Sequence, residues 1–218
     1  MLERISAACT GPRVALLALL AIVNMLVLIL HAELPMVGAM QVAVALQKAD
    51  PTRPLPQHCD AANMVGSPDS IAAFDGRKSG YRVVEVQAIL CAMEANGGQG
   101  KQFYLERHFP IDMVFPLLYG PAMAALYLFL LRQYTWPPRA LMYLALVPLV
   151  AAALDIAENL SVRSLVVGGL PASERLVTLS SALTVAKYAL VQSSAIVTLV
   201  FLSCYLLAQS VQRTSPRV

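Results

Sequence analysis

The chain has few charged and few aromatic residues for its length. Of its 218 residues, 13% are charged and 7% are aromatic, whereas 58% are hydrophobic. The net charge is only +3, and no cluster of Lys and Arg marks a basic surface. Nucleic-acid binding is not expected, because that function needs such a surface. The mean hydropathy of +0.64 is instead typical of a multi-spanning membrane protein.

The motifs of several common enzyme classes are also missing. The sequence has no G-x-S-x-G nucleophile elbow, no P-loop and no dinucleotide-binding fingerprint. The four cysteines match neither a redox C-x-x-C nor paired zinc spacing. No histidine lies clearly inside an apolar segment, where a haem held between helices needs its axial ligands. No cofactor is therefore assigned.

Four long apolar segments predict an all-α fold, a four-helix transmembrane bundle. A bilayer needs about 20 apolar residues per helix. We expect spans at residues 14–31, 111–131, 140–160 and 176–208. The first segment has a second interpretation, a signal-peptide core cleaved near Val37-Gly38-Ala39. Its apolar run of 17 residues favours a retained helix, since signal cores are usually shorter.

Residues 32–110, between the first two spans, are polar and mixed in charge. Three prolines exclude regular helix just after Asp50, and Gly97-Gly98 is a helix stop. Helices are predicted for residues 36–48, before the prolines, and for residues 67–74 and 81–96, between the prolines and the glycine pair. No alternating strand pattern is present, so we expect this insert to form a small helical cap.

Positive residues in the short segments predict the orientation. Six arginines flank the ends of the spans on one side: Arg4, Arg13, Arg132, Arg139, Arg213 and Arg217. The positive-inside rule therefore predicts that residues 1–13, 132–139 and 209–218 lie in the cytoplasm. Residues 32–110 and 161–175 are then extracytoplasmic, which places Cys59 and Cys91 in an oxidising compartment. We expect them to form a disulfide worth roughly 3–4 kcal/mol.

Polar side chains within the spans predict one intramembrane site. Asp155, Glu158 and Asn159 share a helix face, and fifteen uncharged residues precede Asp155. Depths counted at about 1.5 Å per residue from the cytoplasmic arginines give two layers. The deeper layer contains Tyr119 and Asp155, for which we expect a hydrogen bond. The upper layer contains Asp112, Glu158, Asn159 and Lys187.

Within the upper layer, Lys187 is expected to pair with Asp112 or Glu158. Lys187 belongs to a stripe of polar residues on the last span that should face the bundle interior: Ser180, Thr184, Lys187 and Ser194. A metal site is a weaker hypothesis. Its candidates are His31, Glu33 and His108, which lack diagnostic spacing and are better explained as solvated or headgroup-facing groups.

The pattern Asp112-x-x-x-Pro116-x-x-Tyr119-Gly120, followed by Asp155-x-x-Glu158-Asn159, resembles uncharacterised bacterial four-helix membrane proteins. The resemblance covers the second and third spans, about a quarter of the chain. It implies the four-helix topology and a bacterial inner-membrane location, and no activity.

Three functions stay open. The favoured one is a non-catalytic accessory or structural subunit, or a small-ligand binder, in contact with the bilayer and with other membrane subunits or a second copy. The second is an enzyme acting on a lipid or quinone-like substrate, with Asp155 or Glu158 as acid–base group and Tyr119 as hydrogen-bond donor. The third is a proton-coupled carrier formed by oligomerisation. An enzyme predicts a lateral, apolar-walled opening that reaches Asp155, whereas an accessory subunit predicts a filled bundle.

Overall fold

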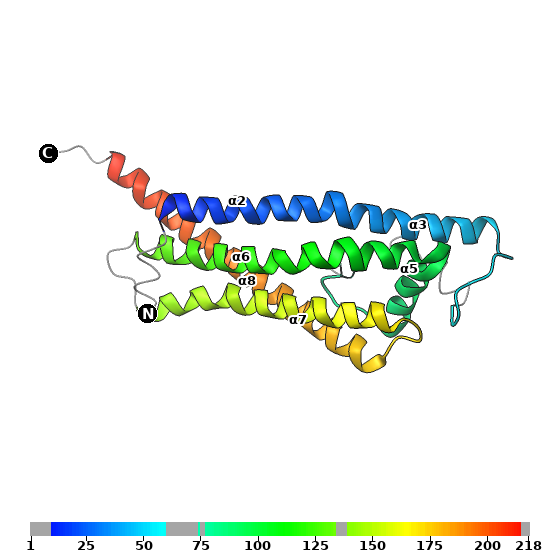
Figure 1. Ribbon diagram of the computed structural model, residues 1–218. Helices are drawn as coiled ribbons and strands as arrows, with labels where there is room; N and C mark the ends of the chain where they lie inside the picture. The colour runs from blue at the N-terminus through cyan, green and yellow to red at the C-terminus, as the bar shows by residue number, and fades with distance from the viewer. Residues whose placement is uncertain (1–9, 60–73, 75–76, 134–138, 215–218) are drawn as a thin grey trace.

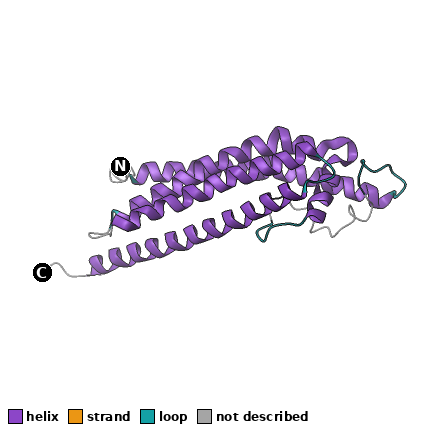
Figure 2. Ribbon diagram, turned by 90° about the horizontal axis from the view of Figure 1, so that it is seen from below, coloured by secondary structure: helices purple, strands orange, loops and turns teal. Residues whose placement is uncertain are grey.

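The structure is a computed structural model that describes residues 10–59, 74, 77–133 and 139–214. Within these ranges every regular element is a helix, and none is a strand (Figure 2). Four helical stretches of the described chain are long and apolar enough to cross a membrane: Gly11–Ala49, Val83–Leu131, Ala140–Gly168 and Glu174–Tyr205. The predicted all-α fold with four membrane-spanning helices is therefore confirmed.

The first span is one long helix that does not end near residue 31, as the sequence had suggested. α2 (Gly11–Leu28) continues through a π-helical turn, η1 (Ile29–Glu33), into α3 (Leu34–Ala49) (Figure 1). Pro35 cannot donate a backbone hydrogen bond, and a π turn directly before it absorbs the local irregularity. The helix continues because Met36, Met40 and Ala43 extend its buried stripe, and it ends before Pro51.

The second span also begins earlier than its predicted start at residue 111. α5 (Val83–Phe103) joins η4 (Tyr104–His108) and α6 (Phe109–Leu131) in one helical stretch. The backbone leaves helical geometry only between Ala95 and Gly98, where Asn96, Gly97 and Gly98 have positive φ. The predicted stop at Gly97-Gly98 is therefore confirmed, but the chain resumes a helix directly after it.

The last two spans follow the prediction more closely. A 3₁₀ turn, η5 (Arg139–Ala145), leads into α7 (Leu146–Gly168), and α8 (Glu174–Thr214) follows. α7 continues past its predicted end at residue 160 because Val162, Leu165 and Val166 extend its buried face. It ends at Gly169, whose φ of 67° favours glycine.

The helices pack in chain order, α2 against α6, α6 against α7 and α7 against α8. The start of α2 lies at the same end of the bundle as the end of α6, and α3 and α5 lie at the opposite end (Figure 1). Each end has its own apolar core. The core at the α3–α5 end includes Met36, Met40, Ile89, Met93 and Val166, and the other includes Val14, Tyr127 and Leu128. The polar site lies between these cores.

The predicted disulfide is present. Cys59 and Cys91 are bonded, with their Cα atoms 5.7 Å apart, and they tie the segment after α3 to α5. The predicted helix at 67–74 lies outside the described residues except for Phe74, which is buried in the core at the α3–α5 end. The connection between the second and third spans contains Tyr134 and Trp136, aromatic residues of the kind that the sequence predicts at interfacial depth, and both also lie outside the described residues.

Candidate functional site

Lys187 of α8 lies between two carboxylates of α7. Its Nζ is 2.9 Å from Oδ1 of Asp155 and 2.5 Å from Oε2 of Glu158. All three side chains are buried, with exposed fractions of 8% for Lys187, 7% for Asp155 and 0% for Glu158. The ammonium and the carboxylates therefore compensate one another away from water, as charges inside a membrane require.

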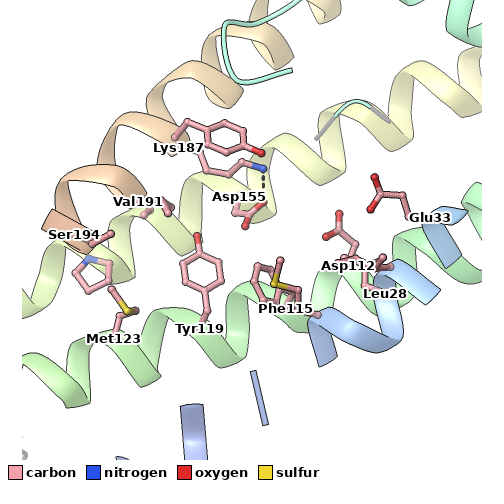
Figure 3. A pocket seen from close by; sticks show the side chains of 16 residues that line it. Leu28, Glu33, Asp112, Phe115, Tyr119, Met123, Asp155, Lys187, Val191 and Ser194 are labelled. Atoms are coloured by element: carbon pink, nitrogen blue, oxygen red, sulfur yellow. Dashed lines mark hydrogen bonds and ion pairs between the residues drawn. The ribbon is translucent and has the colours of Figure 1, made fainter. Parts of the chain in front are cut away.

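The predicted division into two layers is wrong in one respect. Lys187 pairs with Glu158 as expected, but it also pairs with Asp155, which had been assigned to Tyr119. Asp155 and Glu158 are one helical turn apart, so a single flexible lysine reaches both. The Tyr119 hydroxyl points toward Asp155 and interacts with it, without completing a hydrogen bond of good geometry (Figure 3).

A series of hydrogen bonds made by hydroxyl groups extends from Glu158, a partner of Lys187, toward the α3–α5 end. Thr184 donates a hydrogen bond to Oε1 of Glu158 at 2.5 Å, and its hydroxyl also lies 3.0 Å from the carbonyl oxygen of Ser180. The Ser180 hydroxyl shares a short hydrogen bond with the hydroxyl of Tyr81. The predicted polar stripe of α8 is indeed buried, at Ser180, Thr184, Lys187 and Ser194. Tyr81 was missed because it is 99 residues from its partner in the sequence.

Asp112 and Asn159 lie beside the Lys187 pair, on the side of the α3–α5 end. Together with His108 and Tyr104 they line a cavity of about 10 Å³, which is room for about one water molecule. Asn159 is 2% exposed, and its Nδ2 has no hydrogen-bond partner among the described residues. Asp112 is 6% exposed and also lines the larger pocket described below, so it connects the two spaces.

The three metal-site candidates do not share one environment. His31 is exposed, Glu33 lines the large pocket, and His108 is buried and stacks on Tyr104 with ring centroids 5.3 Å apart. No group of three or more His, Cys, Asp or Glu side chains suited to a metal ion is found in the described part of the chain.

A pocket of about 490 Å³ opens beside the Lys187–Asp155 pair (Figure 3). Its walls come from α2 and η1 on one side, α6 and α7 at the base and α8 on the other side. Met25 and Ala195, on the two rims, are exposed, so the pocket opens at the surface that α2 and α8 present to lipid. Its apolar lining includes Leu28, Phe115, Met123, Pro148 and Val191. Its charged lining residues are Glu33, Asp112, Asp155 and Lys187.

A second, apolar hollow of about 540 Å³ lies between α2 and α6. It shares four lining residues with the first pocket: Met25, Phe115, Tyr119 and Met123. Small residues such as Ala18 and Ala122 form its floor and leave room between the helices. The two spaces therefore form one continuous groove with a polar end and an apolar end.

Two hydroxyl groups on this groove are short of hydrogen bonds. Ser194 is 2% exposed and lines the pocket, yet its Oγ has no hydrogen-bond partner within the described ranges. The Tyr119 hydroxyl is buried as well and faces Asp155, but it completes no hydrogen bond within the described ranges. A buried hydroxyl without a partner is costly, so both groups are suited to bind a polar ligand.

Sequence reasoning singled out the charged residues of the pocket but not its walls. No role was predicted from the sequence for Met25, Phe115 or Met123. Tyr188 also lines the pocket, and its ring lies 5.4 Å from Nζ of Lys187. The available signal was the run of alanines on α2 that faces bulky residues of α6, which is evident only once the two helices are paired.

Comparisons with protein families, with curated proteins and with solved structures found no match to this chain.

Proposed function

We propose that this protein binds an amphiphilic small molecule that enters from the bilayer, with its polar head at the Lys187–Asp155 pair. One observation carries the proposal: an apolar-walled pocket open toward lipid reaches a buried charged cluster. Ligand sites are usually concave and mostly apolar, with a few convergent polar groups. An accessory subunit needs only a filled bundle, whereas a ligand binder and a membrane enzyme both need a lateral, apolar-walled opening that reaches Asp155. The pocket therefore favours these two over a purely structural subunit, and binding is the function they share.

The orientation belongs to the same proposal. Arg13 and Arg132 lie at one end of the bundle, and the Cys59–Cys91 disulfide lies at the other. Basic residues favour the cytoplasmic side, and disulfides persist in oxidising compartments. We therefore assign the end with Arg13 to the cytoplasm of a bacterial inner membrane and the α3–α5 end to the outside. The pocket then opens in the outer part of the bilayer.

Photocrosslinking tests the proposal. Protein in phosphatidylcholine nanodiscs is irradiated with hexadecanol carrying a diazirine, and the labelled peptides are mapped by mass spectrometry. We expect labels to concentrate on groove residues such as Met25, Phe115 and Met123. Ala195→Trp, on the pocket rim, should abolish this labelling, whereas Ile196→Trp, on the neighbouring lipid-facing position, should preserve it. Labelling spread evenly over lipid-facing positions in both variants would refute the proposal.

A membrane enzyme is the second candidate, and Tyr119 is the observation that favours it. Its hydroxyl faces Asp155 inside the pocket, which sets a hydrogen-bond donor beside a group capable of acid–base chemistry. An enzyme would return some amphiphiles with an altered mass after incubation, and Tyr119→Phe would stop that conversion. If the lipid extracts are recovered unchanged, the enzyme candidate is refuted and binding remains as the proposed function.

A further inference from the structure

The wall that α8 contributes to the pocket has two polar positions. Lys187 and Ser194 both line it, and they are seven residues apart, which places them on one face of the helix. At about 1.5 Å per residue, they are separated by about 10 Å along α8. Val191, an apolar lining residue, lies between them (Figure 3). The pocket therefore presents a charged group and a hydroxyl group to two different parts of a bound molecule.

The hydroxyl group of Ser194 differs from those of its neighbours on α8. Ser193 donates to the carbonyl oxygen of Ala189 at 2.7 Å, and Thr198 donates to that of Ser194 at 2.9 Å. Bonds of this kind to the preceding turn are common for hydroxyl groups within helices. The Oγ of Ser194 makes neither this bond nor any other within the described residues, although Ser194 is only 2% exposed. An unsatisfied buried donor is costly, so a group from outside the chain that reaches it is bound favourably.

The backbone at Ser194 is held in place by α6. The hydroxyl of Tyr127 donates a hydrogen bond to the carbonyl oxygen of Ser194, which also accepts the bond from Thr198. Tyr127 is itself 1% exposed and belongs to the apolar core at the end of the bundle where α2 begins. Because α8 is fixed to α6 at this residue, the hydroxyl of Ser194 is carried by a rigid wall, and little ordering is required when a ligand binds.

We propose that the ligand is an amphiphile with two polar groups: a head at the Lys187–Asp155 pair, and a carbonyl oxygen within its chain that accepts a hydrogen bond from Ser194. This inference rests on the proposed function, since it names the chemical class that the same pocket binds. Figure 3 shows Met123 near Ser194, at the end of the pocket away from Asp155. Met123 also lines the hollow between α2 and α6, so the hydrocarbon beyond the carbonyl continues into that hollow.

An uncharged acceptor suits the position next to Ser194 better than a charged group. Met123 and Val191, its labelled neighbours in Figure 3, are apolar, and an ion there would lose its hydration without gaining a counterion. The acidic lining residues lie toward the other end of the pocket, where the ammonium group of Lys187 meets Asp155. A carbonyl oxygen takes the proton that the serine hydroxyl has to donate. In the bilayer core the same carbonyl finds no donor, so its transfer into the pocket gains a hydrogen bond.

The position of the carbonyl along the chain tests this proposal. A hydrocarbon chain advances about 1.3 Å per carbon, given single bonds of about 1.5 Å, so a separation of about 10 Å corresponds to about eight carbons. Three alcohols of equal length compete against the diazirine-bearing hexadecanol: plain hexadecanol, a mid-chain ketone eight carbons from the hydroxyl-bearing carbon, and a tail ketone twelve carbons from it. We expect the mid-chain ketone to displace the probe at a concentration about fivefold below that of hexadecanol, as one net hydrogen bond provides. The tail ketone should compete no better than hexadecanol.

Two serine variants test the donor. Ser194→Ala should remove the advantage of the mid-chain ketone and leave competition by hexadecanol unchanged, because only the hydroxyl is lost. Ser193→Ala removes a hydroxyl from the adjacent exposed residue, outside the pocket, and should preserve the advantage. The melting temperature of the ligand-free protein should be unchanged or higher in Ser194→Ala, since the hydroxyl satisfies no group in the described chain. A lower melting temperature would show that the Oγ already has a partner in the protein, and would overturn the proposal.

The outcomes separate this inference from the proposed function. If the mid-chain ketone competes no better than hexadecanol, or the tail ketone competes equally well, the carbonyl at Ser194 is refuted while amphiphile binding stands. If the advantage survives Ser194→Ala, another group is the donor and the assignment is wrong. If a diol with its second hydroxyl at the mid-chain position competes better than the ketone, the ligand group at Ser194 is a donor and the proposed class is wrong. If the probe never labels the groove, both proposals fall.

Discussion

Lys187 is the residue on which the interior of the bundle depends. It compensates Asp155 and Glu158, both almost fully removed from solvent, and it connects α8 to α7. Each charge alone would be costly in this environment, because the free energy needed to remove it from water exceeds the stabilisation that one weak contact provides. Removing the shared partner therefore leaves two buried carboxylates without compensation.

Lys187→Leu should lower the free energy of unfolding by about 3–5 kcal/mol, as expected when one partner of a buried ion pair is removed. The measurement is equilibrium unfolding in mixed micelles. Lys101→Leu is the matched control, because its pair with Glu94 is partly exposed, at 29% and 24%. It should cost less than about 1 kcal/mol. Equal losses for the two variants would contradict the pairing.

Thr184→Val should also destabilise the protein, since Thr184 donates to the buried Oε1 of Glu158. A hydrogen bond to a charged group is worth about 1.5–3 kcal/mol. In Thr178→Val the lost hydroxyl binds only the carbonyl oxygen of Glu174 at an exposed position, and the change should stay within about 0.5 kcal/mol. A Thr184→Val variant as stable as Thr178→Val in the same unfolding assay would argue against the Thr184 bond.

At the scale of the elements, the contact between α6 and α7 depends on a glycine. A Cβ atom built on Gly120 would lie 2.6 Å from Cβ of Ala152 and 3.3 Å from the carbonyl oxygen of Pro148. Small residues let membrane helices approach closely, and here that approach positions Tyr119 next to Asp155. Gly38, in α3, is different, since a Cβ there meets no atom within 4 Å.

Gly120→Ala should therefore cost about 1–3 kcal/mol through overpacking. Gly38→Ala should instead stabilise the protein by about 0.5–1 kcal/mol, because alanine favours the helix. Thermal unfolding of both variants in one detergent gives the comparison. A melting temperature that rises in both would show that α6 and α7 are not in close contact at Gly120.

The sequence predicted the existence of these elements better than their ends. Apolar length identified all four spans, because a bilayer imposes it. The ends at residues 31 and 160 were placed too early, and the start at residue 111 was placed too late, because polarity was taken as the boundary. The helices continue as far as residues such as Met40, Tyr104 and Val166 bury one face against neighbouring helices. That burial depends on partners distant in the sequence.

The same limit applies to the site. The spacing of Asp155, Glu158 and Asn159 was enough to place them on one buried face, and all three are buried. Which carboxylates pair with Lys187 depends on the position of α8 relative to α7 along the bundle axis. Counting residues along the chain gives that position only to within about one helical turn. The pocket could not be predicted, since its walls are ordinary apolar residues, and the space between them depends on how closely α2, α6, α7 and α8 approach one another.

At the scale of the whole molecule, the bundle has two dissimilar ends. The first helix has 39 residues, about 58 Å, roughly twice the hydrocarbon thickness of a bilayer. One end of this helix is therefore expected to extend beyond the membrane, and we propose that it is the α3 end, which packs on α5 near the Cys59–Cys91 disulfide.

Cysteine labelling tests the orientation of this assembly. In a background carrying Cys9→Ser and Cys204→Ser, Thr52→Cys should react with a membrane-impermeant maleimide on intact cells. Gln133→Cys, exposed at the opposite end, should react only after permeabilisation. If Gln133→Cys is labelled on intact cells and Thr52→Cys is protected, the orientation is the reverse of the one proposed.

The central claim is that the groove between α2 and α8 holds one amphiphile per chain. Native mass spectrometry of the protein purified from its own membrane tests it most directly, with Ala195→Trp and Ile196→Trp purified in parallel. We predict a single stoichiometric adduct on the wild type and on Ile196→Trp, and its loss from Ala195→Trp. A bare chain in all three samples, or the same scatter of adducts on each, would contradict the account.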